Sequence, residues 1–573
     1  MKKAVALLLA AVLSIGMFAA CKKEDTPPPE DTPEVTTPVP DNSPDPSTPP
    51  PVEPAKETYF NHYLDDDVTT LDPCLTDNGT DGNVLINILE PLTRYTVQAD
   101  GTYEFEPAGA KSWSSNADET EWTFILNDNF WEDGQPVTAY DYEYAIRRNC
   151  DPEVDAYLGW QLDCLKNYYA LWDGDVGLDE LGVEAVDDKT LVITLEETTP
   201  YFFQLTAIQV MLPQRQDIVE LYGEQFGSDV DYFLSCGPFK IDSWTAESVV
   251  LLKNENYWDA ANVALDRVNL AFILEGATIM AAFENGEIDQ VAANSAEWRD
   301  RFLAMDGAEY HPVDDNGPST YYFFNTKDDL FQNEKIRKAF IVALDRDELC
   351  ELVYTGTSIP NYGWIPPTMT VGDDNYSEKA GFPVKDLIAE YPDPKALLLE
   401  GMAELGLGDD PSKLDVLFKF SSGSQLTHSI AEYIQQNFKE VLGVEIAIDF
   451  GEWTTFSASV KSGDFQMAQM GWGAYYNDPI DLLSLFRSDW DSINTGWASD
   501  EFDDLIRQAS SETNDAKRLD LYIQAERLIF DAGVVCPVRC LTYQYFVRDY
   551  VQGARFGTFS DNSYKLYDTS ARP

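Results

Sequence analysis

Helix patterns that end in glycine and are followed by a strand pattern constrain the fold of this chain more than any other feature. Apolar residues recur at helical spacing over 397–407, where two glycines act as stop signals. A second amphipathic helix is expected over 430–442, with Gly443 just beyond it and a strand at 444–448. This alternation of helices and strands predicts an α/β fold.

Three further segments fit the same fold class. Leu191–Leu195 and Val249–Leu252 are typical of strands, and 515–530 is typical of a helix. The part from about residue 57 to the C-terminus is long enough for two or three domains with substantial cores. Hydrophobic residues make up 44% of the chain, which suits a folded globule.

The charge balance is strongly acidic. The chain has 39 basic and 100 acidic side chains, for a formal net charge of −61. Such a field repels nucleic acid and anionic lipid, so we expect no nucleic-acid partner. It would favour cationic ligands, but we interpret it first as a source of solubility at a cell surface.

The N-terminus has the layout of an export signal, predicted over 1–20. Lys2 and Lys3 precede an apolar run that is too short for a comfortable membrane span, and small residues precede Cys21. An anchor that is never cleaved is the alternative. The ending resembles a bacterial lipobox, although Phe18 stands where leucine is preferred. The resemblance implies cleavage before Cys21, its diacylation, and a firm anchor in the cell membrane.

Residues 21–57 are predicted to be a disordered linker. They are mostly Pro, Thr, Asp, Glu and Ser and contain almost nothing apolar to form a core. Their proline density favours an extended spacer that spans on the order of 100 Å. A proline-rich docking ligand is the alternative interpretation. The folded part of the chain is expected over 58–573.

The cysteines carry no clear signal. Seven follow Cys21, and an odd number leaves at least one thiol free if all pairs are intramolecular. Cys536 and Cys540 form a CxxxC in an apolar, strand-like stretch, which we interpret as buried thiols rather than a redox or zinc site.

No catalytic constellation is present in the sequence. The three histidines, His62, His311 and His428, are far apart, and no HExxH, GxSxG, Walker A or GxGxxG motif occurs. Residues 77–82 faintly resemble a calcium loop, but two ligand positions do not fit, so a flexible acidic loop is expected. We therefore expect a protein that is not an enzyme, with no cofactor and no metal.

Several ordered motifs resemble one family. They include Thr-Leu-Asp-Pro at 70–73, Leu-Glu-Pro-Leu-Thr-Arg-Tyr at 89–95, Trp-Glu-Asp-Gly-Gln-Pro-Val-Thr-Ala-Tyr-Asp at 131–141, Cys-Gly-Pro-Phe-Lys at 236–240, and Gly-Trp-Gly-Ala-Tyr-Tyr-Asn-Asp-Pro at 471–479. Together they resemble the extracellular solute-binding proteins of oligopeptide, dipeptide and nickel ABC importers. The resemblance runs from about Tyr59 to the C-terminus.

The resemblance implies a two-lobed α/β fold of the type II periplasmic-binding-protein class, in its large form with three subdomains. The expected boundaries are lobe I at 58–95, 213–312 and 531–573, a subdomain at 96–212, and lobe II at 316–530. Two crossings, near 312–318 and 527–535, would form a hinge, and ligand would bind between the closing lobes. The implied partners are a small ligand, most plausibly a peptide, and the permease of an ABC importer; a monomer is expected.

The same resemblance places the ligand site. By position, Asp77, Asn78 and Gly79 match the wall of the first lobe. The matching positions of the second lobe are Tyr321, Trp453, Gly471, Trp472, Gly473, Ala474, Tyr475, Asn477 and Asp478. For each of these residues, a loop or core role is the alternative.

One departure from the family pattern concerns Tyr475. Peptide-binding relatives have an aspartate there that pairs with the α-ammonium of the ligand. Losing a buried pair worth ~1.5–3 kcal/mol should weaken capture of a free N-terminus by about ten- to a hundred-fold. Asp478 is a candidate substitute. Basic side chains that relatives use for the peptide carboxylate are also missing at Val460 and Gln469, and Arg539 is a candidate replacement.

Two other functions remain open. The same fold would bind a sugar oligomer, a metal chelate or a modified peptide, and a cleft of stacked aromatic residues would favour that alternative. The second is a surface sensor or adhesin that is not coupled to import.

Overall fold

The computed structural model describes residues 56–76, 78–98, 102–313, 319–421, 424–491, 493–559 and 562–573. The predicted signal segment, Cys21 and almost all of the predicted linker lie outside the described residues. Residues 56–573 form one compact unit.

A four-stranded sheet begins the fold and joins segments that are far apart in the sequence. Its strand order is β1 (Tyr59–Leu64), β10 (Arg267–Phe272), β9 (Ser248–Lys253), β8 (Phe239–Trp244). β1 and β10 are parallel and the other pairs are antiparallel. In β9, Val249 and Leu251 are buried and alternate with more exposed neighbours, as expected for a strand with one face on a core.

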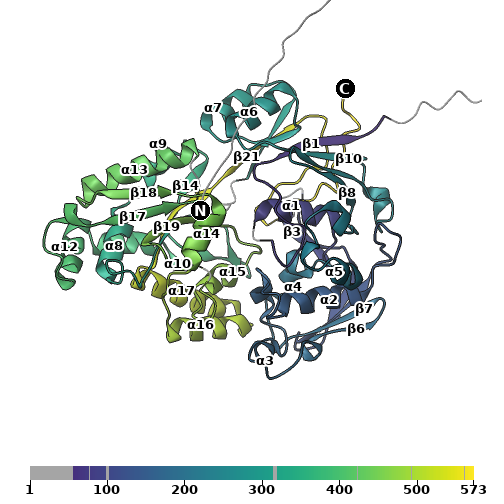
Figure 1. Ribbon diagram of the computed structural model, residues 1–573, viewed down its shortest axis with the longest axis horizontal. Helices are drawn as coiled ribbons and strands as arrows, with labels where there is room; N and C mark the ends of the chain where they lie inside the picture. Colours follow the sequence, from purple (N-terminus) through teal and green to yellow (C-terminus); the bar gives the residue numbers. More distant parts are fainter. Residues whose placement is uncertain are drawn as a thin grey trace, which may run out of the picture. The chain divides into compact units, whose positions relative to one another are not determined.

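A second, three-stranded sheet has its own small core. Its order is β11 (Gln290–Ala292), β21 (Tyr543–Arg548), β12 (Ala308–Val313). Helices α6 (Gly276–Asn285) and α7 (Ala296–Leu303) lie beside it (Figure 1). Phe283, Phe302 and Phe546 pack together there.

Residues 93–222 form a third region, built on an antiparallel sheet of order β4 (Ala110–Ser115), β5 (Glu121–Leu126), β7 (Thr190–Thr194), β6 (Val183–Asp187). The hairpin of β2 (Thr93–Val97) and β3 (Tyr103–Pro107) precedes it. The helices of this region are α2 (Ala139–Cys150), α3 (Tyr168–Trp172), α4 (Phe202–Leu205) and α5 (Gln216–Tyr222).

The largest sheet has six strands in the order β14 (Ser358–Pro360), β20 (Val535–Leu541), β13 (Ser319–Phe324), β19 (Met467–Trp472), β17 (Val416–Phe420), β18 (Ile446–Phe450). β13 is fully buried, so both of its faces are covered. Its sequence, Ser-Thr-Tyr-Tyr-Phe-Phe, is accordingly rich in aromatic residues.

Helices surround this sheet (Figure 1). They are α8 (Glu334–Ala343), α9 (Arg346–Leu352), α10 (Tyr376–Ala380), α11 (Pro383–Glu390), α12 (Pro394–Glu404), α13 (Gln425–Val441), α14 (Trp453–Lys461), α15 (Pro479–Leu483), α16 (Asp500–Ser511) and α17 (Asp515–Ala532). The two-residue strands β15 (Thr370–Val371) and β16 (Asp374–Asn375) form a separate small hairpin.

We call residues 319–541 the second lobe and the other described residues, 56–313 and 543–573, the first lobe. β20 belongs to the second lobe because it pairs with β13 and β14, although the last of the three segments predicted for lobe I was 531–573. The chain returns to the first lobe at Thr542, between β20 and β21. The other predicted boundaries stay predictions.

The elements expected from sequence patterns are present with shifted ends. The helix predicted over 430–442 begins five residues earlier, at Gln425, where Ser424 caps it. The strand predicted at 444–448 is displaced by two residues, to Ile446–Phe450. The helix predicted over 515–530 is α17, and Gly533 ends it in a left-handed conformation. The strands predicted near 191–195 and 249–252 are β7 and β9.

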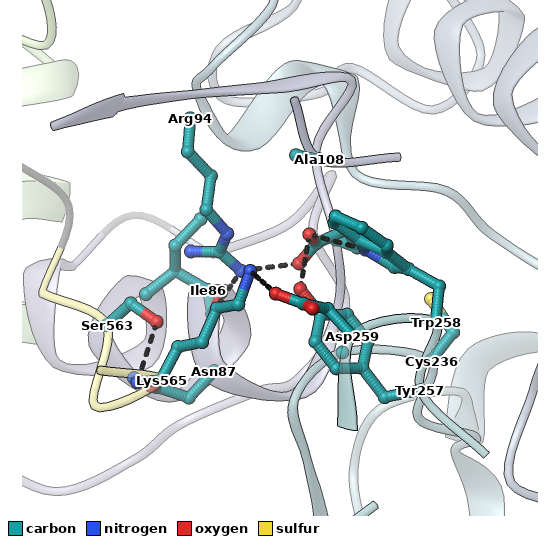
Figure 2. A network of polar contacts seen from close by, with 12 residues as sticks. Ile86, Asn87, Arg94, Ala108, Cys236, Tyr257, Trp258, Asp259, Ser563 and Lys565 are labelled. Atoms are coloured by element: carbon teal, nitrogen blue, oxygen red, sulfur yellow. Dashed lines mark hydrogen bonds and ion pairs between the residues drawn. The ribbon is translucent and has the colours of Figure 1, made fainter. Parts of the chain in front are cut away.

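A buried polar network ties the first lobe together. The carboxylate of Glu90 is fully buried and accepts hydrogen bonds from Arg94 Nη2 at 2.5 Å, Tyr257 Oη at 2.7 Å and Trp258 Nε1 at 3.3 Å. Lys565 pairs with Asp259 at 2.7 Å and lies over the rings of Tyr257 and Trp258 (Figure 2). Lys565 thereby fixes the C-terminal segment to residues 257–259.

The seven described cysteines are free and buried, including Cys536 and Cys540 in β20. Burial raises the pKa of the Cys540 thiol to about 11, which leaves it protonated and inert at neutral pH. Among the described residues, no helix combines the length and the apolar character that crossing a membrane would require.

Candidate functional site

The first wall of the site is the N-terminus of α1 (Gly79–Ile88) and the loop before it. Asn78 caps the helix, because its Oδ1 accepts the Asp81 N–H at 2.9 Å. Asp81 is buried and accepts hydrogen bonds from Thr69 and from the Thr76 hydroxyl. Burial raises the pKa of Asp81, and these donors oppose the rise.

The expectation of a flexible acidic loop over 77–82 was therefore wrong for 79–82. These residues are helical, and Asp81 satisfies loop and cap groups instead of binding solvent. Asp77 lies outside the described residues. No group of three or more possible metal ligands occurs in the part of the chain that the structure describes.

The second wall is the segment that follows β19. The strand ends with Gly471 and Trp472. A loop that begins with Gly473, Ala474 and Tyr475 follows, and α15 begins at Pro479.

Asp478 serves the structure of this segment. Its Oδ1 accepts the Ile480 N–H at 3.1 Å as the N-cap of α15, and its Oδ2 lies 3.6 Å from Arg518 Nη2. The side chain is only 2% exposed. Burial raises the pKa of Asp478, and Arg518 opposes the rise. Asp478 is therefore engaged inside the second lobe and is poorly placed to replace an aspartate at position 475.

Two adjoining pockets lie between these walls. The amide pocket, of about 250 Å³, is lined by Asn78 and Gly79 from the first lobe and by Ala474 and Tyr475 from the second. Its polar lining is rich in side-chain amides, which both donate and accept hydrogen bonds; they are Asn78, Asn83, Gln204, Gln209 and Asn562.

The tryptophan pocket, of about 390 Å³, is lined by Trp160 from the first lobe and by Trp453, Trp472 and Trp490 from the second. The two pockets adjoin, because residues close together in the chain line both of them. Leu75 and Trp472 line the tryptophan pocket, and Thr76 and Ala474 line the amide pocket. Of the predicted site residues, the structure thus brings together Asn78, Gly79, Ala474 and Tyr475 in one pocket and Trp453 and Trp472 in the next.

Other predicted site residues lie away from these two pockets. Tyr321 is fully buried in β13 and packs edge-on against Trp364, with ring centroids 4.9 Å apart. Arg539 donates from Nη1 to the Ser358 hydroxyl at 2.7 Å and lies 4.3 Å from the Tyr354 ring centroid. Arg539 is thus already engaged within the second lobe, and its role towards a ligand carboxylate stays a prediction.

Asn477 joins the two lobes. Its backbone N–H donates to Gln204 Oε1 at 3.0 Å, and Gln204 Nε2 donates to the Asn477 carbonyl at 3.2 Å. The rings of Tyr201 and Tyr476 stack beside this pair at a centroid distance of 5.9 Å. Gln204 and Tyr476 of these contacts also line the amide pocket.

Further contacts between the lobes involve residues that the sequence did not single out. Gln161 Nε2 donates to Asp481 Oδ1 at 3.2 Å, and Arg487 forms an ion pair with Asp163. A larger cavity of about 730 Å³, lined by both partners of that ion pair, opens beside them. In each pair, the two partners are hundreds of positions apart in the sequence. A local sequence motif therefore cannot predict that they meet.

Asp481 is the most perturbed carboxyl of this interface. It is fully buried, and burial raises its pKa to about 8. Nearby Asp478 raises the pKa further, whereas the N–H groups of Tyr475 and Tyr476 lower it. The Tyr475 N–H donates to Asp481 Oδ2 at 2.6 Å, so this carboxyl links the segment after β19 to Gln161 of the first lobe.

The arrangement of lobes and pockets defines a class of protein. The fold matches a solved structure described as Listeria monocytogenes OppA bound to peptide, with a TM-score of 0.79 and 26% identity, over 90% of this chain and 99% of that one. The chain thus has the two-lobed type II α/β fold of solute-binding proteins, as its motifs predicted.

Sequence comparison gives the family. The model of the bacterial extracellular solute-binding proteins, family 5 (middle region), matches residues 104–494. The oligopeptide-binding protein OppA of Bacillus subtilis (strain 168) is 33% identical over 491 residues, 84% of this chain and 87% of the relative. The dipeptide-binding protein DppE of the same strain is 32% identical over 504 residues, 87% of this chain and 89% of the relative. The chain belongs to the family 5 extracellular solute-binding proteins.

Proposed function

We propose that this protein is the ligand-capturing component of an ABC importer and that its ligand is a peptide. The observation that carries the proposal is the pair of adjoining pockets, each walled by both lobes. A ligand in these pockets touches both lobes at once and is buried when they close. Relatives whose names state oligopeptide or dipeptide binding support the peptide over other ligands.

Closure of the two lobes is the conformational change that the importer would recognise. The contacts of Asn477 with Gln204, of Asp481 with Gln161 and of Arg487 with Asp163 all join the lobes. Opening would break them, so a ligand that bridges the lobes shifts the population toward the closed form. A permease that prefers the closed form would then receive loaded receptors.

Recognition of a free N-terminus should be weak in this member of the family. The family resemblance implies an aspartate at the position of Tyr475, and the neighbouring Asp478 already caps α15 and pairs with Arg518. We predict that Tyr475→Asp raises the affinity for peptides with a free α-amine by about ten-fold or more, because it supplies a charge-assisted pair. Isothermal titration with one peptide and its N-acetylated form measures this. Equal gains for both forms would contradict the prediction.

The test of the proposed function uses the purified full-length protein. Native mass spectrometry would show co-purified ligand masses, and thermal shift would then be measured with defined peptide pools. A ligand at 100 times its Kd should stabilise the fold by ~2.7 kcal/mol, which raises the Tm measurably. Peptide masses and shifts with peptide pools would support the proposal; neither a mass nor a shift would overturn it.

The tryptophan pocket is the one observation that favours a non-peptide ligand, because flat aromatic faces also stack on sugar rings. The same thermal-shift experiment therefore includes pools of sugar oligomers and metal chelates. A shift with either pool that exceeds every peptide shift would favour the alternative.

We further propose that the protein is a monomeric lipoprotein, anchored outside the cytoplasm by acylation of Cys21, and that it has no enzymatic activity. The lipobox-like ending before Cys21 supports the anchor, and the family of binding proteins supports the lack of catalysis. Cys21→Ser should move the protein from the membrane fraction to the soluble fraction. Its persistence in membranes would contradict the acylation.

A further inference from the structure

Four of the chain's 13 tryptophans line the tryptophan pocket, together with Tyr157. The aromatic contacts cross the cleft: Tyr157 stacks on Trp472 with centroids 6.4 Å apart, and Trp160 lies 6.1 Å from Trp490. Aromatic rings gain stabilisation from offset-stacked and edge-to-face neighbours beyond the area they bury. A wall of this kind fits a flat apolar group better than a branched or charged one.

The lining includes large apolar side chains that stand open to solvent. Trp453 is 39% exposed and Leu75 is 51% exposed. Trp453 begins α14, and its ring lies 5.9 Å from Phe456 of the same helix, which fixes it in place. Exposed apolar surface concentrated at a cavity marks a place where a partner covers it.

Two buried polar groups lie on the face of the six-stranded sheet that includes Trp472, and they need hydrogen-bond acceptors. In the pairing of β13 with β19, Tyr321 stands opposite Met470 and Ser319 opposite Trp472, so these side chains share one face. Within the described residues, the Tyr321 hydroxyl and the Trp472 indole N–H have no hydrogen-bond partner. Of these two donors, Trp472 lines the tryptophan pocket, and a carbonyl oxygen of a bound peptide backbone is an acceptor of the kind that its indole N–H requires.

We propose that the tryptophan pocket is a specificity subsite that receives one large aromatic side chain of the ligand, preferably that of tryptophan. The proposal rests on the peptide function proposed above and specifies which peptides the receptor prefers. The volume of about 390 Å³ and the aromatic walls from both lobes supply the selectivity.

The charges of the pocket do not favour a basic side chain. Asp155 and Lys461 line it with opposite signs and are both exposed. Asp491 also lines it, but its Oδ1 accepts the Thr495 N–H at 3.0 Å and its Oδ2 accepts the Gly496 N–H at 2.9 Å. Neither of the two carboxylates, Asp155 and Asp491, is therefore both buried and free to pair with an arginine side chain.

The test is a positional scan of pentaalanine, in which Trp, Phe, Leu or Arg replaces each alanine in turn. Kd values come from isothermal titration with the full-length protein. At one position, Trp should improve affinity at least about ten-fold over Ala. Phe should bind about two- to ten-fold tighter than Leu there, because the aromatic contact adds to apolar burial. Quenching or a spectral shift of the intrinsic tryptophan emission should accompany binding.

Trp453→Ala should remove most of the preference for Trp at that position, measured as the ratio of the Kd values for the Ala and Trp peptides. Trp172→Ala is the matched control, because Trp172 is 38% exposed and belongs to α3 in the first lobe. Trp453→Phe should restore part of the preference.

Four outcomes would overturn the inference. Equal affinity for Trp and Ala at every position, or a preference unchanged in Trp453→Ala, would remove the subsite while peptide capture stands. Arg binding tighter than Trp would make the pocket a cation site. No binding of any peptide in the scan, with thermal-shift pools also negative, would overturn the peptide function itself and the subsite with it.

Discussion

At the scale of single residues, Glu90 shows how much depends on one buried charge. Its carboxylate accepts from Arg94, Tyr257 and Trp258, and both Glu90 and Arg94 are shielded from solvent. Removing one partner of a buried ion pair typically costs ~3–5 kcal/mol, because the other charge stays buried. We predict that Glu90→Gln lowers the free energy of unfolding by several kcal/mol, on the order of that range, and lowers the Tm measured by calorimetry.

The control for Glu90 is a carboxylate in an exposed pair. Glu404 pairs with Lys335 at 2.9 Å on the surface, with both side chains well exposed. Glu404→Gln should change stability by less than ~1 kcal/mol, since exposed pairs contribute little. If the two variants melted at the same temperature, the network around Glu90 would have no special role in stability.

At the scale of elements, the N-terminus of α1 couples stability to the site. Asn78 caps this helix and also lines the amide pocket. Asn78→Ala should cost ~1 kcal/mol of stability and should also weaken ligand binding, because the first turn of α1 would fray. Asn78→Asp keeps a capping oxygen and should retain the stability. Chemical denaturation and titration of the same two variants check both effects; a loss of stability equal in the two variants would contradict the capping role.

The elements themselves were largely predictable from sequence. The helix α13 and the strand β18 follow from apolar periodicity and a glycine between them, which are local signals. The resemblance carried by the motif at 471–479 predicts ligand contacts for Trp472, Ala474 and Tyr475. These residues line the two pockets, and their contact with a ligand stays a prediction. The contact of Gln161 with Asp481 was not predictable, because it joins residues 320 positions apart whose neighbours carry no distinctive pattern.

At the scale of the whole molecule, the ion pair of Arg487 with Asp163 should favour the closed arrangement. Both side chains are mostly shielded, at 15% and 17% exposure, and Arg487 also bonds the Tyr169 hydroxyl of the first lobe. We predict that Asp163→Asn weakens ligand affinity by about ten-fold, mainly through faster release, because closure loses a charge-assisted bond. Stopped-flow release rates measure this. Asp504→Asn, which breaks only the exposed pair with Arg507 inside α16, should leave the release rate unchanged.

Asp481 should make closure depend on pH. Its pKa lies near 8 in this structure, because burial disfavours the carboxylate, against an ordinary value of 3.8. Between about pH 4 and pH 8 the closed form therefore holds a proton that an open or unfolded form releases. The contribution of Asp481 to closure and stability is therefore complete below about pH 4. It declines as the pH rises from there to about 8, by at most about ten-fold in equilibrium constant per pH unit.

Other buried carboxyls with raised pKa values, such as Asp478 and Glu526, would contribute in the same direction, so the comparison must isolate Asp481. Asp481→Asn keeps an acceptor for the Tyr475 N–H but cannot titrate. The ratio of ligand affinities of the wild type and Asp481→Asn, measured from pH 5 to pH 8.5, should fall as pH rises. A ratio that stays constant over this range would show that Asp481 keeps one protonation state whether the lobes are open or closed.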